Sequence, residues 1–209
     1  KALALFDKAR LLGPGTLVEE AALRRSIALA IGQKDAARFV QWSNQYVRRF
    51  LRSPYASQFA DTFVNGVMDL SATVDFAEVD DVIARMAPEQ RQVIYLRLAR
   101  RGAIEGVAAV SAFAAPRAGE AGATPENDPR AMLYAALADV TSENVDAVAK
   151  RLEGIDAARL SRRDRELFDA VRKVSTQITA PLAPEPAAPP EVDAPPATID
   201  TATAAAQDG

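Results

Sequence analysis

The apolar residues of this chain recur three and four positions apart along almost its whole length. Phe39, Trp42, Tyr46 and Phe50 follow one another at these spacings, which place them on one face of a helix. The period-two alternation of apolar and polar residues that marks a half-buried strand is absent from the sequence. The sequence therefore predicts an all-α fold.

Prolines, glycines and capping residues divide this pattern into ten expected helices. They span residues 5–12, 16–32, 35–50, 54–70, 76–86, 88–101, 104–113, 132–140, 142–155 and 161–178. A Gly-Pro-Gly turn at residues 13–15 ends the first helix, and Thr16 and Glu19 have the spacing of a capping box for the second. Pro54 is expected at the first position of the fourth helix, and Gly102 between the sixth and the seventh.

Proline residues also punctuate the chain at a repeating interval. Pro14, Pro54 and Pro88 each stand between two expected helices, at separations of 40 and 34 residues. Helix pairs that repeat at about this period are typical of tetratricopeptide-like solenoids. We therefore expect a helical-repeat domain over residues 1–180, in which a loop near 116–129 separates a last set of helices. A non-repetitive helical bundle is the alternative.

The last part of the chain, residues 181–209, differs from the rest in composition. It holds seven of the thirteen prolines, much alanine and threonine, five acidic residues and no basic residue. Such a segment cannot bury enough apolar surface to offset the entropy cost of ordering it, so we expect a disordered, Pro/Ala-rich acidic tail. The whole chain has a net charge of −3, so these five acids leave the helical part near +2. That charge is too weak for a nucleic-acid surface.

The residue types missing from the chain exclude most enzyme chemistry. There is no histidine and no cysteine, which removes the commonest general base, the thiol nucleophile and the usual transition-metal ligands. No Gly-rich phosphate loop is present, and the adjacent Asp80 and Asp81 point in different directions on a helix. The sequence therefore predicts no catalytic residue, no cofactor and no metal site. No apolar run approaches the roughly eighteen residues of a membrane-spanning helix.

The densest group of aromatic and basic residues lies at the third expected helix and just beyond it. Its members are the candidates for binding a partner, namely Trp42, Tyr46, Arg48, Arg49, Arg52 and Tyr55. Aromatic residues favour the centres of interfaces, and the arginines suit an acidic partner. The alternative is structural, because aromatic residues at helical spacing pack between helices and cations at a helix C-terminus complement its dipole. Arg97, Arg100 and Arg101 repeat the basic arrangement at the expected end of the sixth helix, which favours the structural interpretation.

Some opposite charges stand four positions apart with the acid first. Glu20 and Arg24 form one such pair, and Asp81 and Arg85 form another. This orientation stabilises an exposed helix surface. We therefore expect these side chains to lie on solvated faces.

Longer stretches of the sequence resemble the MotC family, which consists of periplasmic motility proteins of rhizobial-type bacteria. The stretches that carry the resemblance are residues 2–12, 14–27, 46–50, 53–56, 133–136 and 152–160. The resemblance covers roughly residues 1–178, and the tail is less constrained.

The resemblance implies a periplasmic accessory protein of the flagellar motor that is needed for motor rotation. It implies that the partner is the periplasmic part of the stator protein MotB, and it brings no catalytic residue. Family members are longer and begin with a signal peptide, which fits a chain that starts at Lys1 inside an amphipathic pattern. We therefore expect the N-terminal part to be missing. The alternatives are a tetratricopeptide-like adaptor of cell-envelope assembly and, against the residue types present, a helical enzyme domain.

Overall fold

The computed structural model describes residues 2–121, 128–139 and 145–179, and every regular element in these ranges is helical. The elements are α1 (Ala2–Leu12), α2 (Leu17–Gly32), α3 (Ala36–Arg49), α4 (Ala56–Asp69), α5 (Phe76–Ala84), α6 (Pro88–Glu105), α7 (Ala108–Glu120), α8 (Pro129–Asp139), α9 (Val145–Glu153), the 3-10 helix η2 (Ala157–Arg159) and α10 (Arg162–Thr179). The all-α prediction is confirmed for this part of the chain. The predicted tail at 181–209 lies outside the described residues.

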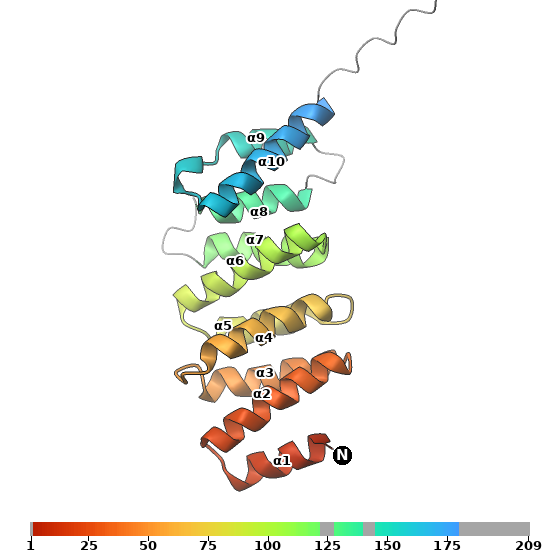
Figure 1. The fold of residues 1–209 in the computed structure, drawn as a ribbon, viewed down its shortest axis with the longest axis vertical. Helices are drawn as coiled ribbons and strands as arrows, with labels where there is room; N and C mark the ends of the chain where they lie inside the picture. The colour runs from red at the N-terminus through yellow and green to blue at the C-terminus, as the bar shows by residue number, and fades with distance from the viewer. Residues whose placement is uncertain (1, 122–127, 140–144, 180–209) are drawn as a thin grey trace, which may run out of the picture. The chain divides into compact units, whose positions relative to one another are not determined.

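The helices of the described unit are stacked in chain order, with every second helix in the same layer (Figure 1). Contacts run from α2 to α4, from α4 to α6, from α6 to α8 and from α8 to α10. In the other layer α3 contacts α5, and consecutive helices such as α2 and α3 or α6 and α7 join the layers. Each helix therefore packs mainly on near neighbours in the chain.

Aromatic side chains form the core between α2, α3 and α4. The Tyr46 and Phe59 rings stack with centroids 4.1 Å apart, and the Phe39 and Phe63 rings stack at 5.5 Å. Trp42 is also buried, with 6% of its surface exposed. Aromatic pairs of this kind contribute about 0.5–1.5 kcal/mol beyond the burial of their surface. Helical spacing thus places these aromatic residues in the core, as the packing interpretation expects.

The predicted helix boundary at Gly102 is wrong, because α6 continues through this residue to Glu105. The residue that ends α6 is Gly106, whose φ of 72° lies in the left-handed region where glycine is favoured. Gly102 has a different function. A Cβ atom there would lie 2.7 Å from the backbone nitrogen of Ser111, so only glycine allows α6 and α7 to approach this closely.

The predicted loop at 116–129 begins too early. Pro116 lies inside α7, which continues to Glu120. A proline inside a helix removes one backbone hydrogen bond and costs about 3 kcal/mol. Burial of Ala115 and Ala118 on either side of it keeps this segment packed as a helix. Residues 122–127 lie outside the described part of the chain.

Three predictions about helix starts and faces are also corrected. Thr16 precedes α2, but its hydroxyl donates to the Gly13 carbonyl at 2.6 Å and makes no side-chain cap. Pro54 lies before α4, in a turn closed by a hydrogen bond from the Ala56 nitrogen to the Ser53 carbonyl at 3.0 Å. Glu20 is buried rather than solvated, with 1% of its surface exposed.

Candidate functional site

Three tyrosine hydroxyls inside the stack donate hydrogen bonds to carboxylates on another helix. Tyr46 of α3 donates to Glu20 of α2 at 2.7 Å, and Tyr95 of α6 donates to Asp80 of α5. Tyr134 of α8 donates to Asp164 of α10 at 2.8 Å. The carboxylates of Glu20, Asp80 and Asp164 therefore each accept a hydrogen bond that joins two helices. The fold uses these groups for packing rather than leaving them free for proton transfer. Arg117 adds a second hydrogen bond to Asp80, at 3.1 Å.

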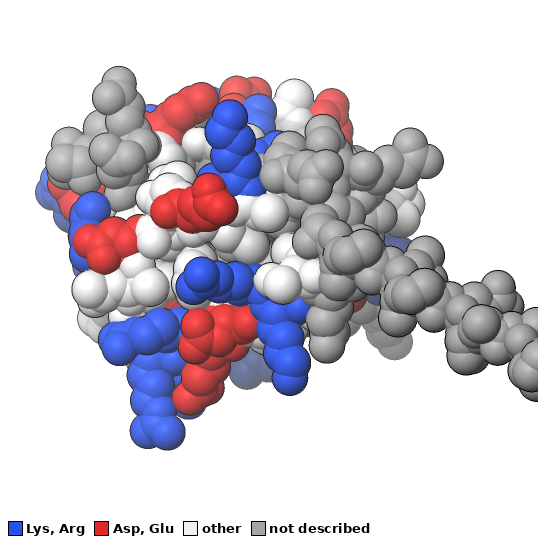
Figure 2. Space-filling view, turned by 90° about the horizontal axis from the view of Figure 1, so that it is seen from above, with Lys and Arg blue, Asp and Glu red and all other residues white. Residues whose placement is uncertain are grey.

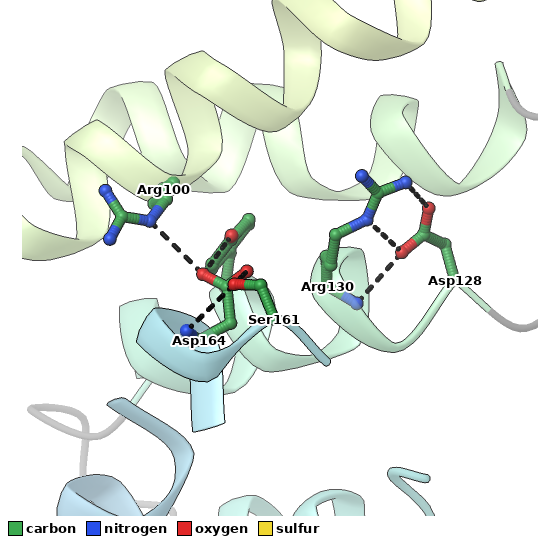
Figure 3. Close-up of polar contacts among 6 residues, drawn as sticks. Arg100, Asp128, Arg130, Ser161 and Asp164 are labelled. Carbon is green, nitrogen blue, oxygen red and sulfur yellow. Dashed lines mark hydrogen bonds and ion pairs between the residues drawn. The ribbon is translucent and has the colours of Figure 1, made fainter. Parts of the chain in front are cut away.

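Of these three carboxylates, Asp164 accepts hydrogen bonds from the largest number of side chains (Figure 3). Besides Tyr134 it accepts hydrogen bonds from Ser161 at 2.6 Å and from Arg100 at 3.2 Å. Burial alone would raise the pKa of Asp164, but the hydrogen bonds from Ser161, Tyr134 and Arg100 outweigh it and hold the pKa below its usual value. Nearby, Arg130 binds Asp128 at 2.7 Å (Figure 3). Both carboxylates thus stay ionised and paired at neutral pH.

Alkaline pH is expected to destabilise the fold through the three tyrosines. Burial first, and then the hydrogen bond to a carboxylate, raises the pKa of Tyr46, Tyr95 and Tyr134 above the ordinary 10.0. The folded chain therefore holds these protons more tightly than the unfolded chain. Their contribution to stability is complete below about pH 10 and is lost as the pH rises above it.

The check is a spectrophotometric titration of tyrosine ionisation beside circular dichroism. We expect the absorbance of the three ionised tyrosines to rise together with the loss of helix. Ionisation of three tyrosines near pH 10 in a chain that stays helical would contradict this assignment.

A groove runs between α4 and α6, and its two ends differ in chemistry. One end is an apolar cavity of about 280 Å³, whose lining includes Ala56, Ala60 and Val93. The other end is a cavity of about 470 Å³ with arginines in its wall. Arg97 lines both cavities, so we treat them as one surface, the α4–α6 groove.

Carboxylates and an amide hold the arginines of the α4–α6 groove in place. Arg97 donates to Asp61 of α4 at 2.7 Å. Arg101 donates to Glu105 at 2.6 Å and also binds Asn65 of α4. The arginines therefore do not cap the end of α6, and the dipole interpretation is wrong for them, because α6 extends past them to Glu105.

The structure divides the predicted partner-binding residues among three places. Trp42 and Tyr46 are buried in the core, with 6% and 0% of their surface exposed. Arg48 and Arg49 line a separate cleft of about 600 Å³ between α1, α2 and α3, where Arg49 binds Glu19 at 2.6 Å. The third place holds the two remaining residues, Arg52 and Tyr55.

Tyr55 and Arg52 lie in the connection that leads into α4 and are exposed. The Arg24 guanidinium stacks over the Tyr55 ring at 4.4 Å and binds Gln58 at 2.5 Å. The same connection supplies Leu51 to the apolar cavity of the α4–α6 groove. These two predicted residues are therefore neighbours in sequence of the groove, whereas Arg48 and Arg49 are not part of it.

Sequence reasoning did not identify Arg97, Arg101 and Val93 as surface-binding candidates. A signal for the two arginines exists, because Asp61 and Asn65 each stand 36 residues before the arginine they bind. That separation is close to the interval between the prolines. Matching arginines to polar acceptors one repeat apart would have indicated two helices that pack side by side.

Charges of both signs lie interspersed on the end of the stack that carries α9 and α10 (Figure 2). Within residues 2–121, 128–139 and 145–179, no cluster of three or more acidic side chains is arranged to hold a metal ion. In the same ranges, the helices are too short or too polar to cross a membrane.

Comparison with known proteins places the chain near one family. The sequence profile of the family described as "Chemotaxis protein MotC" matches residues 1–209. A protein of Rhizobium meliloti (strain 1021) named "Chemotaxis protein MotC" is 38% identical over 184 residues, which cover 87% of this chain. The match spans 42% of the length of that relative. No solved structure matches the chain.

Proposed function

The chain belongs to the chemotaxis protein MotC family, and from this premise we propose that it is a non-catalytic accessory protein of the flagellar motor. In this proposal it works in the periplasm and binds the periplasmic part of the stator protein MotB, and motor rotation depends on that contact. Family membership is the main support for this proposal, because the family is described as a chemotaxis protein family.

We propose further that the described unit is a tetratricopeptide-like solenoid. Four polar contacts along the stack support this architecture, because they join residues at a nearly constant separation. The separation is 34 residues for Arg24 and Gln58, 35 for Lys34 and Asp69, 36 for Arg97 and Asp61, and 37 for Arg117 and Asp80. A constant separation is what a repeated helix pair produces when each pair stacks on the one before.

The chemistry of the polar groups supports a binding role over catalysis. The buried or half-buried carboxylates Asp80, Asp128 and Asp164 are each bound by an arginine, and two of them also by a tyrosine. A general acid or base has to face a substrate with a displaced pKa suited to proton transfer near neutral pH. The pKa values of Asp128 and Asp164 are displaced in the other direction, toward permanent ionisation. Exposed side chains, among them Arg48, Arg49, Arg52 and Tyr55, are left as contacts for a partner.

Motility of a gene-deletion strain tests the proposed function. We expect deletion of the full-length gene to abolish swimming in soft agar while flagella are still assembled, and the wild-type gene to restore it. An export-blocked version of the same gene, retained in the cytoplasm, is the matched control and is expected to fail. Swimming that persists after deletion, or rescue by the export-blocked version, contradicts a periplasmic motor function. Loss of other envelope assemblies together with flagella would favour the general adaptor instead.

A further inference from the structure

The arginines of the α4–α6 groove are fixed in direction and still have donors to spare. Arg97 and Arg101 stand four positions apart on α6, so they lie on the same side of that helix. Each guanidinium has five N–H donors, and the contacts with Asp61, Asn65 and Glu105 use only part of them. Their side chains remain 49% and 35% exposed. The groove therefore presents oriented donors to solvent.

The ion pairs that hold these arginines are easily exchanged. Asp61 is 67% exposed and Glu105 is 44% exposed, and ion pairs between exposed side chains contribute little to stability because water screens them. Carboxylates of a partner can add to the free donors or replace Asp61 and Glu105 at little cost. The guanidinium group of arginine binds carboxylates preferentially, because two parallel hydrogen bonds can form between its N–H groups and the two carboxylate oxygens. This end of the groove is suited to acidic side chains.

The other end of the groove is suited to an apolar side chain. Small side chains, Ala56 and Ala60 on α4, leave room opposite α6. Val93 of α6 is 47% exposed there, and the buried side chains of Phe59 and Met86 also line the cavity. An exposed valine in a cavity lined by apolar side chains gains burial when a partner covers it. Because Arg97 lines both ends, one short segment can fill them together.

We infer that the α4–α6 groove is a docking site for an acidic protein segment that carries one aliphatic or aromatic anchor. The acidic residues bind Arg97 and Arg101, and the anchor covers Val93 between α4 and α6. The inference deepens the proposed function and rests on it only for the identity of the partner, which is the periplasmic part of MotB.

Synthetic peptides of matched length test the chemistry of the groove without MotB. One fluorescent peptide combines glutamates with a central leucine, a second has serine in place of leucine, and a third has lysines in place of glutamates. We expect the first to bind the chain best, with an affinity that falls as salt is raised. R97E/R101E is expected to weaken it roughly tenfold or more, and V93S by a smaller factor.

Two matched variants on α10 serve as controls. Arg162 is 93% exposed and pairs with Glu166 four residues on, so R162E changes an exposed charge outside the groove. Val174 is 41% exposed, close to the 47% of Val93, and V174S removes the same atoms elsewhere. Both are expected to bind the peptide like the wild type. Circular dichroism of R97E/R101E should match the wild type, and R97Q/R101Q provides a milder variant if it does not.

The same variants are then titrated with the periplasmic domain of MotB. Equal peptide binding by the wild type and R97E/R101E, or binding of the lysine peptide as strong as that of the glutamate peptide, overturns the docking site. Absence of binding by every glutamate peptide also overturns it. If the peptides behave as expected but the MotB domain does not bind the wild type, the docking site stands and the proposed partner fails. If the MotB domain binds the wild type and R97E/R101E equally, MotB stands as a partner, but the assignment of the α4–α6 groove as its docking site fails.

Discussion

Replacing Asp164 with alanine is expected to lower the free energy of unfolding by about 3 kcal/mol. The substitution removes the acceptor shared by Tyr134, Ser161 and Arg100, and leaves the Tyr134 hydroxyl buried without its partner. Breaking a buried ion pair by removing one member costs roughly 3–5 kcal/mol. Arg100 is 39% exposed and can turn to water, which places the expected loss at the lower end. Urea unfolding at pH 7, followed by circular dichroism, measures the loss.

Companion variants separate the parts of this network. Tyr134→Phe removes one hydrogen bond and is expected to cost about 1 kcal/mol. Glu166→Ala breaks the exposed pair with Arg162 on the same helix and is expected to change stability by less than about 0.5 kcal/mol. An Asp164→Ala chain as stable as Glu166→Ala would show that Asp164 does not join α6, α8 and α10 as the structure indicates.

Replacing Gly102 with alanine is expected to destabilise the chain by about 2 kcal/mol. The new Cβ would lie 2.7 Å from the Ser111 nitrogen and 3.1 Å from the Val107 carbonyl oxygen. Both are backbone atoms, so no side chain can rotate away and α7 has to move from α6. Overpacking of this kind costs roughly 1–3 kcal/mol, and only part of it is offset by the better helix propensity of alanine. Thermal unfolding measures the change.

Alanine substitutions at Gly32 and Gly66 provide comparisons for Gly102→Ala. A Cβ atom added at Gly32, at the end of α2, would meet nothing within 4 Å, so Gly32→Ala is expected to raise stability by about 0.5 kcal/mol. Gly66→Ala would meet the side chains of Phe39 and Ile31, and because Phe39 is buried and stacked on Phe63, its cost is expected to be similar to that of Gly102→Ala. A Gly102→Ala chain as stable as Gly32→Ala would contradict the close approach of α6 and α7.

Patterns within one helix were sufficient to predict the fold class and most helices. Apolar spacing along α3 and α4 places Phe39, Tyr46, Phe59 and Phe63 in the core, where the structure has them. The fold class was predictable because a helix that packs against its neighbours needs one apolar face, and that face is visible in the sequence.

Features decided by contacts between helices were not predictable in the same way. A glycine that ends a helix and a glycine at a helix crossing look alike in sequence, which is why the pattern predicts at Gly102 the boundary that Gly106 forms. Glu20 has the spacing of a solvated charge, but the Tyr46 hydroxyl, 26 residues away, makes its burial possible. The α4–α6 groove depends on the same kind of distant pairing.

The family and the structure contribute different parts of the functional proposal. Family membership points to motility, while four polar contacts that span 34 to 37 residues support a repeated scaffold with a groove between alternate helices. Neither part depends on the partner-binding residues suggested by aromatic density alone, since Trp42 and Tyr46 are buried.

Calorimetric titration of the wild-type chain with the purified periplasmic domain of MotB tests the central claim most directly. We expect saturable binding at a defined stoichiometry that weakens as salt is raised and is unchanged in the R162E control. Absence of heat and of co-elution at concentrations well above micromolar, with the folded full-length protein as well as this chain, would contradict the proposed contact.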